Sequence, residues 1–129
     1  MDQQDVTGVW YGRYEADQWD ETNGFIAVLE ELAGAVTGVI TERDSDGSGR
    51  IRRALVSGHR DGATLIFIKQ YDGTGGHDHA LDYAGRIDAE GLEVTGKWAQ
   101  LISSGNFTME REKFTEDALE AEEEAELRI

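Results

Sequence analysis

Residues 24–43 read GFIAVLEELAGAVTGVITER, two runs of alternating side chains joined at Ala33-Gly34. Alternation with a period of two residues is typical of a β-strand that buries one face. A two-residue junction that contains glycine predicts a tight hairpin between two such runs. With this turn, Phe25 faces Glu42, and one face of the hairpin collects the large apolar side chains.

The same alternation recurs over residues 6–113, with no helical pattern between the runs. The predicted strands cover residues 6–15, 24–32, 35–43, 50–59, 63–71, 77–87, 92–102 and 105–113. Eight consecutive hairpin strands in so short a chain favour closure, because closure leaves no unpaired edge. The predicted fold is therefore all-β, an eight-stranded antiparallel up-and-down barrel over residues 1–114, followed by a short acidic helix or tail over residues 115–129.

Three further turns set the predicted register of other hairpins. These turns are Asp61-Gly62, Asp88 to Gly91 and Ser103-Ser104. They place Lys69 opposite Ala54 and Trp98 opposite Leu81. On the other face they place opposite charges across from each other, as expected on a surface in contact with water. The predicted outward pairs are Asp82 with Lys97, Lys97 with Glu110, and Arg86 with Glu93.

Composition excludes several classes of function. The 129 residues carry a formal net charge of −15, which argues against a nucleic-acid or anionic-membrane partner. The absence of Cys excludes disulfides and thiol chemistry. No apolar run is long enough to span a membrane, and the N-terminus lacks the order of a signal peptide, so we expect a cytoplasmic protein. Seven acidic residues and one Arg in residues 115–129 give that predicted tail −6 of the total charge.

Several short motifs resemble those of lipocalin-like and avidin-like barrels. The first strand carries Gly8-Val9-Trp10, similar to the Gly-x-Trp of those families, and the predicted last strand supplies Arg111 where such barrels often pack a basic residue over that Trp. Streptavidin-like proteins and lipocalin-like domains of unassigned function share further positions. These are Trp10-x-Gly12-x-Tyr14, Ala35-Val36-Thr37-Gly38, Phe67-x-Lys69-x-Tyr71, Tyr83-x-Gly85, Gly96-x-Trp98 and Gly105-x-Phe107-x-Met109. The resemblance implies a calycin-type barrel. It does not extend to the polar biotin ligands, where this chain has residues such as Ile40 and Leu81.

Strand direction divides the predicted barrel into two ends. Short turns such as Ala33-Gly34 close one end, and the longer loops at 15–23, 44–49 and 72–76 surround the other end, where binding sites usually lie. Inward positions at the looped end include charged side chains, which inside a barrel are either paired or in contact with a ligand. The predicted ligand-binding residues are Tyr14, Phe25, Glu42, Arg52, Lys69, Tyr71, His79, Trp98, Gln100 and Phe107.

Two interpretations of these inward charges are open. In one, Glu42 pairs with Arg52 across its own hairpin in a hydrated mouth, and the amine of Lys69 reaches water. In the other, Lys69 and His79 help to orient a polar group of a ligand above an apolar floor. The second favours a non-enzymatic protein, without a cofactor, that binds a small, partly apolar molecule with an anionic or carbonyl group. The alternatives are an isomerase or cyclase with Lys69 and His79 as acid–base groups, and an interaction module.

Two further features bear on partners. The pair His77-x-His79 is one ligand short of a zinc site, so no metal is predicted. Apolar residues also occupy outward positions of the first four strands: Val9, Tyr11, Ile26, Val28, Val39 and Leu55. They form either one contiguous surface for a homodimer or scattered exposed side chains.

Overall fold

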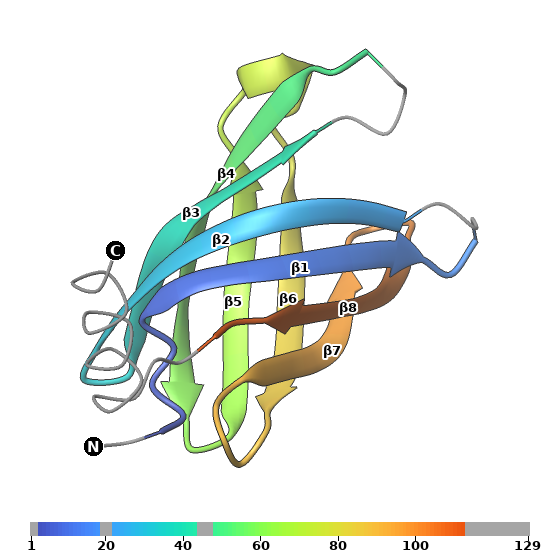
Figure 1. Ribbon diagram of the computed structural model, residues 1–129. Coiled ribbons are helices and arrows are strands. Elements are labelled where there is room, and N and C mark those ends of the chain that lie inside the picture. Colours follow the sequence, from blue (N-terminus) through green and yellow to red (C-terminus); the bar gives the residue numbers. More distant parts are fainter. Residues whose placement is uncertain (1–2, 19–21, 44–47, 113–129) are drawn as a thin grey trace, which may run out of the picture.

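Eight antiparallel strands close into one barrel in the computed structural model (Figure 1). The strands are β1 (Gly8–Ala16), β2 (Thr22–Leu32), β3 (Ala35–Arg43), β4 (Ile51–Asp61), β5 (Thr64–Tyr71), β6 (Ala80–Ile87), β7 (Glu93–Ala99) and β8 (Ser104–Glu110), with a 3₁₀ turn, η1 (Thr74–Gly76), after β5. The structure describes residues 3–18, 22–43 and 48–112. Neighbours in the chain are neighbours in the barrel, and β8 pairs with β1. This confirms the predicted all-β, up-and-down barrel. The predicted acidic tail lies outside the described residues.

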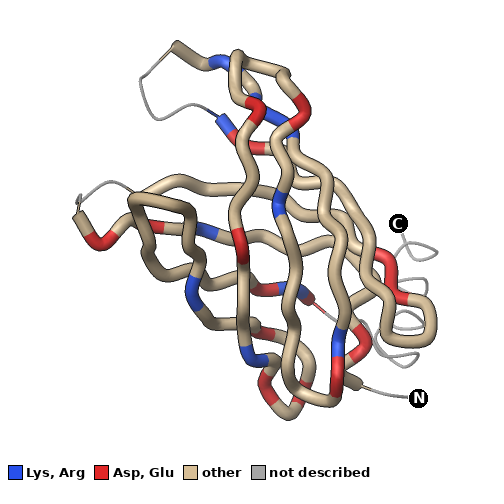
Figure 2. Tube along the Cα trace, turned by 180° about the vertical axis from the view of Figure 1, so that it is seen from behind, with Lys and Arg blue, Asp and Glu red and all other residues tan. Residues whose placement is uncertain are grey.

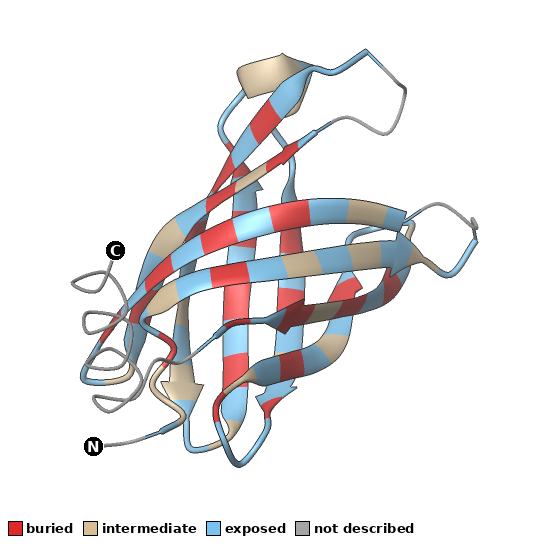
Figure 3. Ribbon diagram, in the orientation of Figure 1, coloured by how far each residue is buried: buried red, intermediate tan, exposed pale blue. Residues whose placement is uncertain are grey.

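Buried and exposed residues alternate along each strand (Figure 3). The inward set forms one core, in which the largest apolar side chains are Trp10, Phe25, Phe67, Tyr71, Tyr83, Trp98 and Phe107. Burial of this alternate set is what drives eight short amphipathic strands to close on one another, since each strand alone would leave its apolar face in water.

The β2–β3 hairpin has the predicted register, with Phe25 opposite Glu42. The β4–β5 hairpin does not, because strand pairing continues to Asp61 and the turn lies at residues 62–63. Lys69 consequently lies opposite Val56 and not Ala54, one level deeper in the barrel. The predicted faces survive this correction because a shift of two residues returns each side chain to the same side of the sheet.

The last two hairpins also differ from the predicted register. Trp98 lies opposite Tyr83 on β6 and Gly105 on β8, because β7 ends at Ala99 and residues 100–103 form the loop. Leu101 and Ile102 are 99% and 83% exposed, so their apolar character wrongly extended the predicted strand. The three predicted outward charge pairs are therefore wrong. Lys97 lies opposite Ala84 and Asn106, and Arg86 lies opposite Thr64 and Thr95.

Glycines at inward positions let the strands coil tightly around the core. The ring of Phe25 lies against Gly12, where an added Cβ would be 2.3 Å from its Cζ atom. An added Cβ at Gly58 would be 2.0 Å from the backbone oxygen of Ile66 on the next strand. Such positions accept only glycine because another backbone or ring occupies the place of the side chain.

The short-turn end of the barrel is closed by buried polar contacts. The guanidinium of Arg111 lies 4.3 Å from the ring centre of Trp10 and donates to the carbonyl oxygens of Thr7 and Gly91 at 2.8 Å each. Arg60 makes a two-bond ion pair with Glu31 at 2.6 and 2.9 Å. The predicted packing of a basic residue over the first-strand Trp is confirmed. Within the described ranges, none of the helical segments is long and apolar enough to cross a membrane.

Candidate functional site

A buried polar cluster lies near the looped end of the barrel, centred on Glu42 of β3. Its Oε2 atom accepts a hydrogen bond from Lys69 Nζ of β5 at 3.0 Å, and its Oε1 atom lies 3.1 Å from Arg52 Nη2 of β4. The hydroxyls of Tyr14 and Tyr71 also donate to Oε1, the former at 3.1 Å. The side chains of Glu42 and Lys69 are 0% exposed. The pairing of Glu42 with Arg52 across the β3–β4 hairpin is confirmed.

Aromatic rings surround the Lys69 ammonium. Its Nζ atom lies 4.5 to 5.8 Å from four ring centres, and 3.4 Å from the Tyr83 hydroxyl. The four rings belong to Tyr14, Phe25, Tyr71 and Tyr83. This arrangement replaces the water around an ammonium with ring faces and one carboxylate. Lys69 is therefore enclosed, and the prediction that its amine reaches water is wrong.

Burial changes the acid–base properties of the cluster. Desolvation lowers the pKa of Lys69, opposed by the attraction of Glu42. Desolvation also raises the pKa of the three cluster tyrosines, which are Tyr14, Tyr71 and Tyr83, and the negative charge of Glu42 adds to each shift. The cluster tyrosines are thus held as neutral hydroxyls that donate or accept hydrogen bonds.

Above the cluster, a cavity of about 210 Å³ opens at the looped end. Its walls combine ring and aliphatic surface with amide, hydroxyl and guanidinium groups. The lining residues are Tyr14, Ala16, Asn23, Arg52, Tyr71, His79, Leu81, Trp98, Gln100 and Ser103. We call this cavity the mouth. The imidazole of His79 lies 4.8 Å from the Tyr71 ring centre, and burial and the positive charges of His77, Arg52 and Lys69 lower its pKa.

The structure brings six of the ten predicted site residues together in the mouth: Tyr14, Arg52, Tyr71, His79, Trp98 and Gln100. Glu42 and Lys69 belong to the cluster below it. Phe25 also borders this cluster, with its ring centre 5.8 Å from Lys69 Nζ and the ring against Gly12, whereas Phe107 packs in the core with its ring centre 4.9 Å from that of Tyr83.

Sequence reasoning missed one polar contact of the site. Asn23 donates to the Tyr14 hydroxyl at 2.9 Å, but its position was assigned to a loop because Gly24 marked the start of the predicted strand. The structure begins β2 two residues earlier, at Thr22, which turns Asn23 toward the mouth. Tyr83, inward in the predicted register but not assigned to the site, has its hydroxyl 3.4 Å from Lys69 Nζ because β6 pairs Tyr83 with Phe67, two residues before Lys69 on β5.

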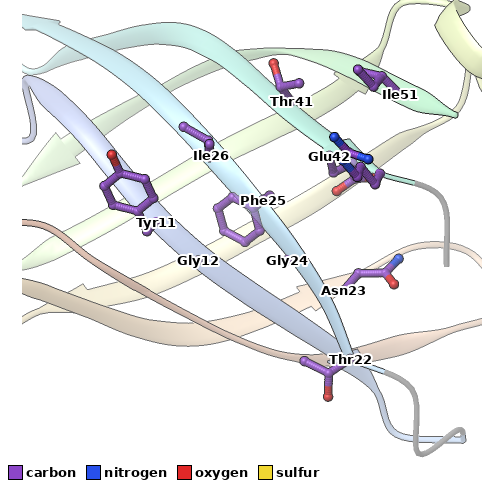
Figure 4. A pocket seen from close by; sticks show the side chains of 11 residues that line it. Tyr11, Gly12, Thr22, Asn23, Gly24, Phe25, Ile26, Thr41, Glu42 and Ile51 are labelled. Carbon is purple, nitrogen blue, oxygen red and sulfur yellow. The ribbon is translucent and has the colours of Figure 1, made fainter. Parts of the chain in front are cut away.

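A second hollow, of about 830 Å³, lies where β2 and β3 diverge toward the looped end (Figures 1 and 4). Tyr11, Ile26 and Ile51 line it together with Thr22, Thr41 and Arg43, and Gly24 contributes no side chain. Phe25 and Glu42 reach it from the inside. We call this hollow the lateral groove. The lateral groove faces outward. It is a different hollow from the mouth, although Asn23 lines both.

The described residues contain no group of three or more His, Cys, Asp or Glu side chains placed to hold a metal ion. What the geometry defines is a closed, eight-stranded up-and-down barrel with a polar mouth at one end, the architecture of lipocalin-like proteins.

Comparison with known proteins gives structural neighbours. No family model and no curated protein matches the chain. Among solved structures, it is similar to the redesigned β-barrel b11L5F_LGL, with a TM-score of 0.70 and 13% identity over 87% of this chain and 96% of that chain. It is also similar to the redesigned β-barrel mFAP1 bound to DFHBI, with a TM-score of 0.69 and 15% identity over 85% and 98% of the two chains. A third, EF1p2_mFAP2b bound to DFHBI, has a TM-score of 0.68 and 13% identity over 87% and 100%. At these identities the likeness shows the fold.

Proposed function

We propose that this protein binds a small anionic molecule with an aromatic or apolar body in the mouth of the barrel. The observation that carries the proposal is the Arg52 guanidinium, which lines the mouth beside the buried cluster. One carboxylate, Glu42, is shared by two cations, Arg52 and Lys69. A guanidinium makes strong, charge-assisted hydrogen bonds to carboxylate-like groups, so its presence in the wall of the mouth favours an anion there.

The mouth places this charge where a ligand can reach it. Arg52 lines the cavity, and its side chain is 10% exposed, whereas Lys69 is sealed beneath. The volume of about 210 Å³ exceeds the roughly 150 Å³ of an apolar cavity that takes up benzene, so one substituted ring fits. Leu81 and Trp98 supply apolar walls for such a ring. Two structural neighbours were solved with the small molecule DFHBI bound, which supports the use of this architecture for small ligands.

The enclosure of Lys69 argues for binding over catalysis. A general base must reach the proton that it abstracts within hydrogen-bond distance, directly or through one water. Lys69 does not line the mouth, and its amine is already engaged by Glu42 at 3.0 Å. We therefore propose no reaction for the mouth.

Three probes of one shape and different charge test the proposal: benzoate, benzamide and benzylammonium. Ligand-observed NMR titration should show benzoate binding at least about tenfold tighter than benzamide, a difference of ~1.4 kcal/mol, and benzylammonium weakest. Arg52→Gln should remove the preference for benzoate. Arg53→Gln is the matched control, because Arg53 is the next residue on β4 and its side chain is exposed on the outer face.

Equal affinities for benzoate and benzamide, or an unchanged preference in Arg52→Gln, would contradict an anion site at Arg52. Native mass spectrometry of freshly purified protein complements the titration, since a co-purified small molecule would report the class of natural ligand directly. A co-purified cation in the mouth would contradict the proposal.

A further inference from the structure

We propose that the outer face of β1–β5 is an interface with a second copy of this chain, arranged so that the strands of the two copies run antiparallel. The first observation is a continuous aliphatic row. Val9, Val28, Val39 and Leu55 are direct cross-strand neighbours on β1, β2, β3 and β4, and they are 40% to 56% exposed. Neighbouring strands lie about 4.8 Å apart, so the row spans roughly 14 Å without interruption.

The row belongs to a larger surface, which we call the outer apolar face. Its members are Val9, Tyr11, Ile26, Val28, Val39, Ile51, Leu55, Ile66 and Ile68, all at least 40% exposed. Outward positions between them are Thr37, Thr41 and Ser57, which are uncharged, and one charged residue, Arg53, between Ile51 and Leu55 on β4. Together the nine side chains expose on the order of 700 Å², above the roughly 300–600 Å² of the largest apolar patch on a typical monomer. A standard interface buries about 800 Å² per partner, so this face is of the size that a specific dimer needs.

Charged residues are abundant elsewhere on this protein, so their scarcity on the outer apolar face is informative. Charged residues are 30% of the chain, and the view from behind shows acidic and basic positions interspersed along the tube (Figure 2). With a net charge of −15, two copies repel each other unless the surfaces that meet exclude like charges or pair opposite ones. The outward positions that separate the members of the outer apolar face carry one charged side chain, Arg53, and no acidic one.

Opposite charges lie at the two edges of the face, and this favours a second copy over an unrelated partner. At the edge near the looped end, Arg13 and Arg43 flank Gly24, whose lack of a side chain leaves the lateral groove open (Figure 4). At the other edge, Glu30 lies two residues beyond Val28 on β2. All three charged side chains are exposed.

A two-fold axis that lies along this face, perpendicular to the strands and at the level of Ala27 on β2, superimposes these edges, because Gly24 and Glu30 are each three residues from Ala27. It brings Glu30 of each copy beside the lateral groove of the other, between the partner's Arg13 and Arg43. The surface is then self-complementary in shape and charge, as an isologous interface requires. The partner copy also covers the lateral groove, whose walls include Tyr11, Ile26 and Ile51 of the same face.

Sedimentation velocity of the full chain over micromolar to submillimolar concentrations tests the interface. The expected result is a concentration-dependent dimer of the 14.3 kDa chain, lost in both Val28→Lys and Leu55→Lys. Both residues are about half exposed, so the folded monomer should survive, which circular dichroism checks. Thr95→Lys, on the outer face of β7, is the matched control and should leave the dimer intact. A monomer at all concentrations, or a dimer that persists in both variants, overturns the proposal.

Charge reversal tests the antiparallel arrangement. Glu30→Arg and Arg43→Glu should each raise the dimer dissociation constant several-fold, because like charges then face each other in two symmetric places. The double variant Glu30→Arg/Arg43→Glu should dimerise more tightly than Glu30→Arg alone, because it restores the opposite-charge contact at position 43 while Arg13 is unchanged. A double variant no tighter than Glu30→Arg overturns the antiparallel pairing. These measurements require no ligand, so their outcome is independent of the anion site in the mouth.

Discussion

Replacing Glu42 with Gln should destabilise the barrel more than replacing its partner Lys69 with Met. In the described part of the chain, Lys69 has two hydrogen-bond partners, Glu42 at 3.0 Å and Tyr83 at 3.4 Å. Glu42→Gln therefore leaves a fully buried ammonium without a carboxylate. Breaking a buried ion pair from one side costs about 3–5 kcal/mol, against a total stability of roughly 5–15 kcal/mol for a domain of this kind.

Lys69→Met leaves a different situation. Glu42 retains Arg52 at 3.1 Å and the hydroxyls of Tyr14 and Tyr71, so its carboxylate stays compensated. The thioether chain fills most of the volume of the lysine stem, and we expect a loss of about 1–2 kcal/mol. The double variant Glu42→Gln/Lys69→Met has no buried ammonium that lacks a carboxylate, so it should be more stable than Glu42→Gln alone.

Urea unfolding followed by circular dichroism, with thermal melts alongside, measures the three free energies. A loss of 3 kcal/mol corresponds to a fall in Tm of at least about 12 °C for a domain of roughly 100 residues. Near-ultraviolet spectra establish that each variant keeps a packed core. The reasoning fails if Lys69→Met is as costly as Glu42→Gln, or if the double variant is less stable than Glu42→Gln.

Three further outcomes follow from the same structure. Burial raises the pKa of the cluster tyrosines in the folded state. Their contribution to folding stability is therefore complete below the tyrosine pKa of the unfolded chain, near 10, and is lost as pH rises above that pKa, because only the unfolded chain then releases these protons. Tyrosinate absorbance should therefore rise together with unfolding, and a rise in the folded protein that accounts for all four tyrosines would contradict their burial. Benzoate affinity should increase as pH falls below the ordinary histidine pKa of 6.5, since the pKa of His79 is lowered and its protonation then adds positive charge to the mouth; His79→Gln should abolish this dependence. Gly58→Ala should cost about 3 kcal/mol in urea unfolding, whereas Gly24→Ala, where an added Cβ would meet nothing closer than 3.7 Å, should cost far less; similar losses would contradict the close approach of Ile66 to Gly58.

The alternation of side chains in the sequence is sufficient to specify the architecture. Strand residues face inward and outward with a period of two, so the run around Ala33-Gly34 specified both the hairpin and its buried face. The outward apolar positions predicted from the sequence, such as Val28 and Leu55, are exposed for the same reason. Errors of two or four residues in later hairpins left every face assignment intact.

Beyond the predicted pair of Glu42 with Arg52, the tertiary structure decided which inward residues meet. The depth of Lys69 depends on the position of the β4–β5 turn. The alternation of side chains does not reveal this position, because a shift of two residues leaves each side chain on the same face. That shift places Lys69 one level deeper against β4, and the separate pairing of β5 with β6 brings it to Tyr83 in the sealed cluster. The lateral groove likewise depends on the divergence of β2 and β3, which is a property of how strands are offset around a closed barrel. The sequence by itself determined the side on which each residue lies, because that is local geometry, whereas the offset between strands depends on turn lengths and on closure of the whole sheet.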